Sequence, residues 1–174
     1  FKKTLESMAQ CYKTVTLGLR IFPTYGSNDH GTVILKWCKQ MSNHLAPEVY
    51  GNGLQERDFI YIDDVVDQIM SLVESPSWSS RIVDIGSGRP VSFNFIVQTI
   101  NDVLKTEIKP KYVPRPANYT EGYACASPLL AKVSLEQGVR KILANIEKPA
   151  YFVAHSCAPN PCGGTDRCLV EPII

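Results

Sequence analysis

The chain has 174 residues, of which 44% are hydrophobic and 20% are charged, a composition typical of one soluble globular domain or slightly more. The net charge is only +1 and no stripe of lysine and arginine is visible, so nucleic-acid binding is not expected. No apolar run reaches the about 18 residues that a membrane-spanning helix needs, and the N-terminal segment lacks the apolar region of a signal peptide. We therefore expect a cytoplasmic protein with no membrane contact, and the first residue, Phe1, suggests a fragment or a processed product.

The spacing of apolar residues predicts the elements of the first half of the chain. In chain order they are the later part of a helix, a strand, a loop of turn-forming residues, a helix and two short strands, at residues 1–13, 15–22, 23–31, 33–41, 48–50 and 59–62. A glycine turn at Gly51 and Gly53 lies between the two short strands. Asp63 or Asp64 is expected to cap the next helix, which runs through Val66, Ile69, Met70 and Val73.

The second half continues the alternation of strands and helices. A strand at 81–85 precedes a helix that Ser92 caps, a strand at 109–113, a polar loop at 114–123 and a final helix that opens with a capping box at Ser134 and Gln137. The apolar residues expected to face inward from the two helices are Phe95, Ile96, Ile100, Val103 and Leu104, and Leu135, Val139, Ile142 and Leu143. Alternating strands and helices indicate an α/β fold.

Residues 51–65 read GNGLQERDFIYIDDV, a glycine turn followed by an arginine, a short apolar strand and two aspartates that open a helix. This segment resembles the GxGxxxRDFIYVDDV signature of the sugar-nucleotide epimerases and dehydratases, the extended short-chain dehydrogenase/reductase group. The resemblance covers about residues 1–148. It implies the C-terminal part of a Rossmann-like enzyme, with the smaller substrate-binding lobe and without the N-terminal dinucleotide-binding half. By that resemblance, residues 1–26 are a remnant of the NAD-binding domain, 27–148 are the sugar-nucleotide-binding lobe, and 149–174 are a cysteine-containing tail of unknown role.

The start of the chain, FKKTLESMAQ followed by LGLRIFPTYG, resembles the family pattern Y-x-x-x-K-K-x-x-E-x-M-A followed by GLRxFNxYG. The resemblance implies that Lys2 is the catalytic lysine of the Tyr-x-x-x-Lys pair, which holds the nicotinamide ribose of NAD and lowers the pKa of the tyrosine. The tyrosine would precede Phe1, and no Gly-rich dinucleotide loop occurs in the 174 residues. Without the resemblance, Lys2 is simply a solvated charge near a terminus.

The end of the first strand carries two further candidates. The resemblance implies that Phe22 touches the nicotinamide ring and that Pro23 stands where relatives have an asparagine that contacts the sugar nucleotide. Proline has neither an N–H nor a polar side chain, so this contact is lost or altered. A strand that ends in a proline turn is the alternative interpretation.

Arg57 lies beside the glycine turn, where its guanidinium can form a bidentate contact with a diphosphate. The resemblance gives the arginine this role and implies that Val49 and Tyr50 line the nucleotide base. The alternative is a salt bridge from Arg57 to Asp58, Asp63 or Asp64.

The loop VPRPAN at residues 113–118 resembles the RPGD segment of the family, in which arginine and aspartate bind phosphate and ribose. Arg115 matches the arginine. Asn118 replaces the acid and can still hydrogen-bond a hydroxyl group, although it carries no charge. An ordinary proline-rich loop explains the same residues.

The chain departs from the family after residue 126, because the expected Leu-Gly-Trp-x-Pro piece is missing before residue 133. Cys11, Cys38 and Cys125 are expected to be reduced thiols. In the tail, Cys157, Cys162 and Cys168 do not match the spacing of a standard zinc finger, so no metal site is expected, although a metal, a disulfide and a simple extension all remain open.

The resemblance implies an NAD-dependent sugar-nucleotide epimerase, which transiently oxidises the sugar and returns the hydride. The ligand would be a nucleotide-diphosphate sugar and the assembly a homodimer. This chain would bind the substrate but remain inactive alone, because it has neither the tyrosine nor the Gly-rich loop. A 4,6-dehydratase or decarboxylase of the same family, and a non-catalytic binding or assembly subunit that keeps the fold, are the alternatives.

Overall fold

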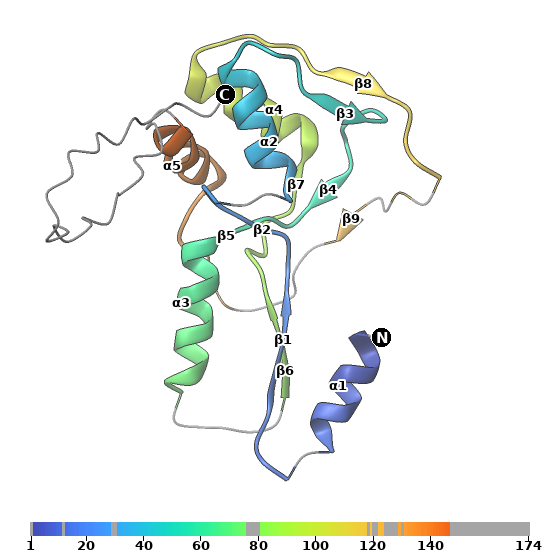
Figure 1. Ribbon diagram of the computed structural model, residues 1–174, viewed down its shortest axis with the longest axis vertical. Helices are drawn as coiled ribbons and strands as arrows, with labels where there is room; N and C mark the ends of the chain where they lie inside the picture. Colours follow the sequence, from blue (N-terminus) through green and yellow to red (C-terminus); the bar gives the residue numbers. More distant parts are fainter. Residues whose placement is uncertain are drawn as a thin grey trace, which may run out of the picture.

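The computed structural model describes residues 2–11, 13–28, 31–75, 81–117, 119, 122–123, 129 and 131–146. The chain alternates strands and helices, which confirms the predicted α/β class (Figure 1). The elements are α1 (Lys2–Gln10), β1 (Leu17–Ile21), β2 (Thr24–Tyr25), α2 (Val33–Ser42), β3 (Glu48–Tyr50), β4 (Glu56–Arg57), β5 (Ile60–Tyr61), α3 (Ile62–Val73), β6 (Arg81–Ile85), β7 (Val91–Ser92), α4 (Phe93–Leu104), β8 (Lys111–Val113), β9 (Gly122–Tyr123) and α5 (Leu135–Ile146).

Helices α2, α4 and α5 pack together in the upper part of the molecule in Figure 1 and form the larger hydrophobic core. Each helix buries apolar residues at helical spacing, and those that are fully buried include Ile34, Trp37 and Met41 of α2, Ile96 and Ile100 of α4, and Val139 and Ile142 of α5. The Trp37 and Phe93 rings meet edge to face, with centroids 5.6 Å apart, a geometry that aromatic pairs favour. The short strands β3 and β8 lie beside this helical lobe.

Strands β1 and β6 form a parallel pair that extends away from the helical lobe, with Leu17 opposite Arg81 and Ile21 opposite Ile85. Helix α3 packs along this pair through Val65 and Leu72, which form a second core with Ile85. Two parallel strands are an unusually small sheet, because parallel sheets normally have more strands and helices on both faces. The predicted strand at 81–85 is confirmed, but its residues 82–84 are only half-buried.

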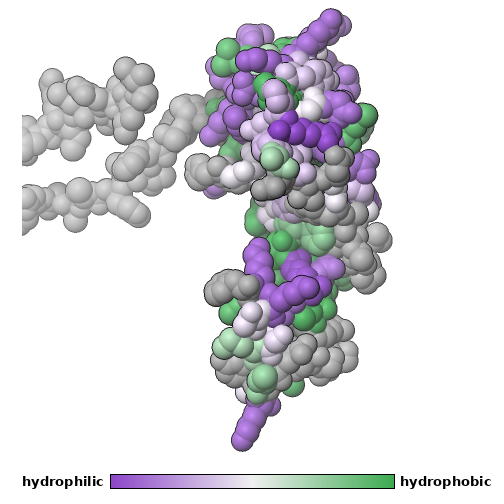
Figure 2. Space-filling view, turned by 90° about the vertical axis from the view of Figure 1, so that its right-hand side faces the viewer, coloured by the Kyte–Doolittle hydropathy of each residue, from purple (hydrophilic) through white to green (hydrophobic). Residues whose placement is uncertain are grey.

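Large apolar side chains are exposed on both sides of this extended part. On the side of α1 and β1 they are Leu5, Met8, Val15 and Ile21, and on α3 they are Ile62, Val66, Met70 and Val73, each between 42% and 54% exposed. Figure 2 views the molecule from the side of α1 and shows hydrophobic patches in its narrow lower part. Apolar surface of this extent typically marks a contact surface.

The prediction that Asp63 or Asp64 caps α3 is wrong. The helix begins one residue earlier, at Ile62, and its N-cap residue is Tyr61, which makes no side-chain capping bond. Asp63 instead binds the Lys141 ammonium at 2.7 Å. The expected inward direction of Phe95 is also wrong, because this side chain is 54% exposed while Ile96 beside it is fully buried.

The two predicted serine caps are confirmed. The Phe95 N–H donates to Ser92 Oγ at 3.2 Å, and the Gln137 N–H donates to Ser134 Oγ at 3.2 Å while Gln137 Oε1 accepts from the Ser134 N–H. Cys11 and Cys38 are free thiols, as expected. The other four cysteines, at 125, 157, 162 and 168, lie outside the described residues. Within the described part of the chain, no helix is long and apolar enough to cross a membrane.

Candidate functional site

The β3–β8 pair brings Arg115 to the glycine turn. Tyr50 lies opposite Val113, and the Gly51 N–H donates to the Val113 carbonyl at 2.8 Å. Arg115 follows two residues later, and its Nη2 donates to Asn52 Oδ1 at 3.0 Å. Gly51 has φ +64°, and a Cβ at this position would overlap the Arg115 side chain. A glycine is therefore needed both for the turn and for the close approach of Arg115.

Arg57 lies in β4, which pairs with β7 on one side and β9 on the other. Its side chain is largely covered, with the residue 8% exposed, and its Nη1 donates to the Glu56 carbonyl at 2.7 Å. The guanidinium carbon lies 5.4 Å from the centroid of the Tyr119 ring, a cation–π geometry. The same ring lies 5.6 Å from the Tyr50 ring, tilted by 58°.

We call Tyr50, Arg57, Arg115 and Tyr119 the Tyr119 cluster. Gln55 joins its two tyrosines, because its Nε2 donates to the Tyr50 carbonyl at 2.9 Å and also lies 3.5 Å from Tyr119 Oη. Sequence reasoning missed Asn52, Gln55 and Tyr119. The first two lie inside the signature at positions where the family pattern specifies no residue, and Tyr119 directly follows Asn118. An aromatic residue next to the RPGD-like loop was the only sequence feature that could have suggested Tyr119.

The predicted base-lining residues differ in their accessibility. Tyr50 is 44% exposed and presents its ring at the surface, whereas Val49 is fully buried in the helical core. Of these two side chains only Tyr50 can therefore meet a ligand. Asn118 lies outside the described residues.

Of the three aspartates named as alternative partners of Arg57, Asp63 binds Lys141, and the other two bind backbone N–H groups. Asp58 accepts hydrogen bonds from the backbone N–H groups of Ser87 and Gly88, at 3.0 and 2.9 Å, and from the Ser87 hydroxyl. Asp64 accepts from the backbone N–H groups of Lys132 and Val133, at 3.0 and 2.9 Å. Both carboxylates are buried and fasten loops from distant parts of the chain.

The residues expected on the NAD side lie elsewhere. Lys2 is exposed at the start of α1, which Figure 1 places beside β1 and β6, away from β3 and β8. Phe22 is half-buried just after β1, where its N–H donates to the Ile85 carbonyl at 2.9 Å, and the Pro23 carbonyl accepts from the Ile60 N–H at 3.0 Å. The structure therefore places Tyr50 and Arg57 against the Tyr119 ring and Arg115 at the glycine turn that follows Tyr50, and it leaves Lys2 apart from them (Figure 1).

A bidentate ion pair ties α1 to β1. Arg20 Nε and Nη2 donate to the two carboxylate oxygens of Glu6, both at 2.8 Å, and this hydrogen bonding lowers the pKa of Glu6. The pair is exposed and contributes little stability. It joins the helix that carries Lys2 to β1.

Comparison with known proteins identifies the family. The model of the NAD dependent epimerase/dehydratase family matches residues 1–86. Protein CapI of Staphylococcus aureus is 30% identical, over 82% of this chain and 51% of its own length. UDP-glucuronic acid decarboxylase 4 of Arabidopsis thaliana is 30% identical, over 79% of this chain and 34% of its own. The solved structure of UDP-glucuronic acid 4-epimerase from Bacillus cereus, in complex with UDP-glucuronic acid and NAD, superposes with a TM-score of 0.75 at 19% identity, over 83% of this chain and 49% of that chain.

The chain belongs to the NAD-dependent epimerase/dehydratase family. It spans about half the length of Protein CapI and about a third of the length of UDP-glucuronic acid decarboxylase 4. Its α/β structure corresponds to the C-terminal half of solved UDP-sugar epimerases, which is the fold class predicted from the signature.

Proposed function

We propose that the chain is the substrate-binding half of an NAD-dependent sugar-nucleotide epimerase and that the Tyr119 cluster binds the nucleoside diphosphate. The observation that carries this proposal is the placement of two arginines around the exposed Tyr50. Arg115 binds Asn52 in the glycine turn that follows Tyr50, and Arg57 lies against the Tyr119 ring, which itself packs on Tyr50. Guanidinium groups suit the bidentate recognition of phosphate, and an exposed aromatic ring suits a nucleobase.

Each residue has a distinct role in this proposal. Tyr50 packs against the base, Arg115 binds the diphosphate from the loop, and Arg57 binds it from β4. Tyr119 covers the Arg57 guanidinium, so the ligand displaces this ring as it binds. Asn118, which is next to Tyr119 in the sequence, hydrogen-bonds a ribose hydroxyl.

We further propose that NAD lies at the other end of the chain, where Lys2 holds the nicotinamide ribose and Phe22 packs against the ring. When bound, NAD supplies the transient oxidation of the sugar. The exposed position of Lys2 and the location of Phe22 at the end of β1 fit this role. Pro23 offers no side-chain hydrogen bond to the substrate, unlike the asparagine of the family pattern.

The dinucleotide-binding half is proposed to cover the exposed apolar residues around β1 and α3. Parallel sheets normally have helices on both faces, and here apolar residues are exposed beside a sheet of only two strands. Further strands and helices of the dinucleotide-binding half would cover these residues. This agrees with the division into a remnant at 1–26, a lobe at 27–148 and a tail at 149–174. The complete enzyme would be a homodimer, and this chain alone would not turn over.

Calorimetric titration of the chain with UDP-, GDP- and dTDP-sugars, with and without NAD, tests the proposal. We expect saturable binding of one nucleotide, weakened at least about tenfold by Arg57→Ala, because a charge-assisted contact is lost. Arg140→Ala removes an exposed arginine paired with Glu136 and should change the affinity less than about twofold.

The alternative within the family is a dehydratase or a decarboxylase. To distinguish it from an epimerase, the chain is fused to an upstream dinucleotide-binding half and the sugar product is identified. A folded fusion that binds the nucleotide but converts no sugar would contradict the enzyme proposal.

Pro23 and the covered Arg57 favour the second alternative, a non-catalytic binding or assembly subunit. That alternative predicts binding that survives Arg57→Ala.

A further inference from the structure

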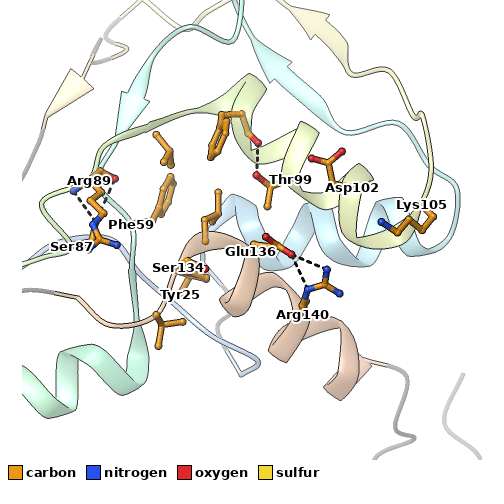
Figure 3. Close-up of a pocket in the computed structure, with 14 residues that line it drawn as sticks. Tyr25, Phe59, Ser87, Arg89, Thr99, Asp102, Lys105, Ser134, Glu136 and Arg140 are labelled. Atoms are coloured by element: carbon orange, nitrogen blue, oxygen red, sulfur yellow. Dashed lines mark hydrogen bonds and ion pairs between the residues drawn. The ribbon is translucent and has the colours of Figure 1, made fainter.

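A cavity of about 440 Å³ is lined by residues of α4 and α5 and of the strands and loops beside them (Figure 3). Its apolar lining consists of Tyr25, Phe59, Val91, Phe95, Val133 and Leu135. The volume is within the range of sites that hold small organic molecules. None of the residues of the Tyr119 cluster lines this cavity.

Two buried carboxylates of the signature hold the borders of the cavity. Asp58 binds the loop at Ser87 and Gly88, and Ser87 lines one side. Asp64 binds the backbone of Lys132 and Val133, and Val133 lines the other side. Because each border is fastened by charge-assisted hydrogen bonds, the cavity is formed before any ligand arrives.

The polar lining of the cavity has more positive than negative groups. Arg89, Lys105 and Arg140 are cationic, and Asp102 and Glu136 are anionic. Arg140 is neutralised by Glu136, with two contacts at 2.8 and 3.0 Å.

The other three charges are not paired with one another. Asp102 accepts a hydrogen bond from Gln98 at 2.8 Å. Figure 3 shows Arg89 at one end of the cavity, and Lys105 and Asp102 at the other. Among the described residues, the side chains of Arg89 and Lys105 have no hydrogen-bond or ion-pair partner.

We propose that this cavity is a second binding site, for a small organic anion with an apolar ring. The ring would pack on Phe59 and Phe95, and a carboxylate, sulfonate or phosphomonoester group would bind the Arg89 guanidinium. Hydroxyl groups at the far end would donate to Asp102. The site shares no residue with the proposed nucleotide site, so it does not depend on the function proposed above.

Titration of the full chain with naphthalene-1-sulfonate, followed by amide chemical shifts, tests the proposal. We expect saturable shifts at residues 87–91, 99–105 and 133–140, which line or border the cavity. Arg89→Ala should weaken binding about fivefold or more, and neutral 1-naphthalenemethanol should bind correspondingly more weakly than the sulfonate. Lys36→Ala, which removes an exposed lysine of α2, should change the affinity less than about twofold.

The proposal would be overturned by the absence of saturable shifts, by equal affinity of Arg89→Ala and wild type, or by equal affinity of sulfonate and alcohol. Shifts centred on Tyr50 and Arg115 would likewise overturn it and would assign the anion to the nucleotide site. Adding UDP separates the two sites, because UDP should leave the sulfonate affinity unchanged. Because Arg89 is exposed, Arg89→Ala should fold normally. The dispersion of its amide spectrum should therefore match that of the wild type.

Discussion

The Tyr119 ring lies over the Arg57 guanidinium, with 5.4 Å between the guanidinium carbon and the ring centroid. Tyr119 comes from the loop after β8 and Arg57 from β4, so this contact joins the two parts of the sequence that resemble the phosphate-binding segments of the family. The same ring packs against Tyr50. Tyr119 therefore contacts two of the residues proposed to bind the nucleotide.

Tyr119→Ala is expected to lower stability and to raise nucleotide affinity. Loss of the cation–π contact with a largely buried arginine should lower the free energy of unfolding by about 1–2 kcal/mol, measured by urea denaturation. Exposure of the guanidinium should tighten UDP binding severalfold in calorimetry. Tyr119→Phe keeps the ring and should change both quantities little. Weaker UDP binding by Tyr119→Ala would contradict this and make Tyr119 part of the binding surface.

Gly51→Ala should reduce nucleotide affinity by displacing Arg115. The new Cβ would overlap the Arg115 side chain, and the positive φ strains any non-glycine residue. Gly88 is a matched control, because its φ is +69° and nothing lies within 4 Å of an added Cβ. Both variants should lose about 1 kcal/mol or more of unfolding free energy, but only Gly51→Ala should weaken UDP binding. Equal UDP affinity of the two variants would show that Arg115 does not contact the ligand.

Asp58→Asn should destabilise the fold by about 2–4 kcal/mol in urea denaturation. The two carboxylate oxygens accept from the N–H groups of Ser87 and Gly88, so an amide nitrogen in place of either oxygen would face an N–H donor. Asp67→Asn is the control, because Asp67 is exposed and pairs with Lys132 at 2.6 Å. It should cost no more than about 0.5 kcal/mol. A small effect of Asp58→Asn would show that the Ser87 loop is held by other contacts.

Cys38 should resist alkylation in the folded protein. Burial raises the pKa of its thiol from 9.0 to about 12, and the thiolate is the reactive form. Iodoacetamide at pH 8 should modify exposed Cys11 and leave Cys38 unmodified until urea is added, as read by peptide mass spectrometry. Rapid modification of Cys38 in the native state would contradict its burial.

The same shift predicts a loss of stability at alkaline pH. The pKa of Cys38 is higher in the folded state than in the unfolded state, so above about pH 9 the unfolded chain releases this proton first. The contribution of the buried, protonated Cys38 thiol to the free energy of unfolding is therefore complete below pH 9 and declines as the pH rises toward 12. Burial also raises the pKa of Tyr25, which acts in the same direction. The free energy of unfolding should fall less steeply over this range in Cys38→Ala than in the wild type.

The sequence alone predicted the features that depend on neighbouring residues. The caps at Ser92 and Ser134 were predictable because each is a bond between residues three apart. The fold class and the family were predictable because residues 51–65 form one continuous pattern. The direction of Phe95 and the start of α3 were not, because helix periodicity leaves the buried face uncertain by about one residue.

The sequence by itself thus determined the α/β class, the family and the arginines to examine. Only the tertiary structure decided what surrounds them. Tyr119 lies over Arg57, and the Arg115 side chain packs closely against Gly51. Asp58 and Asp64 fasten distant loops, and Asp63 binds Lys141 of α5 instead of capping α3. The physical reason is that a buried charged or polar group must find partners, and which partners reach it depends on how distant segments pack. That packing leaves no trace in the local spacing of residues.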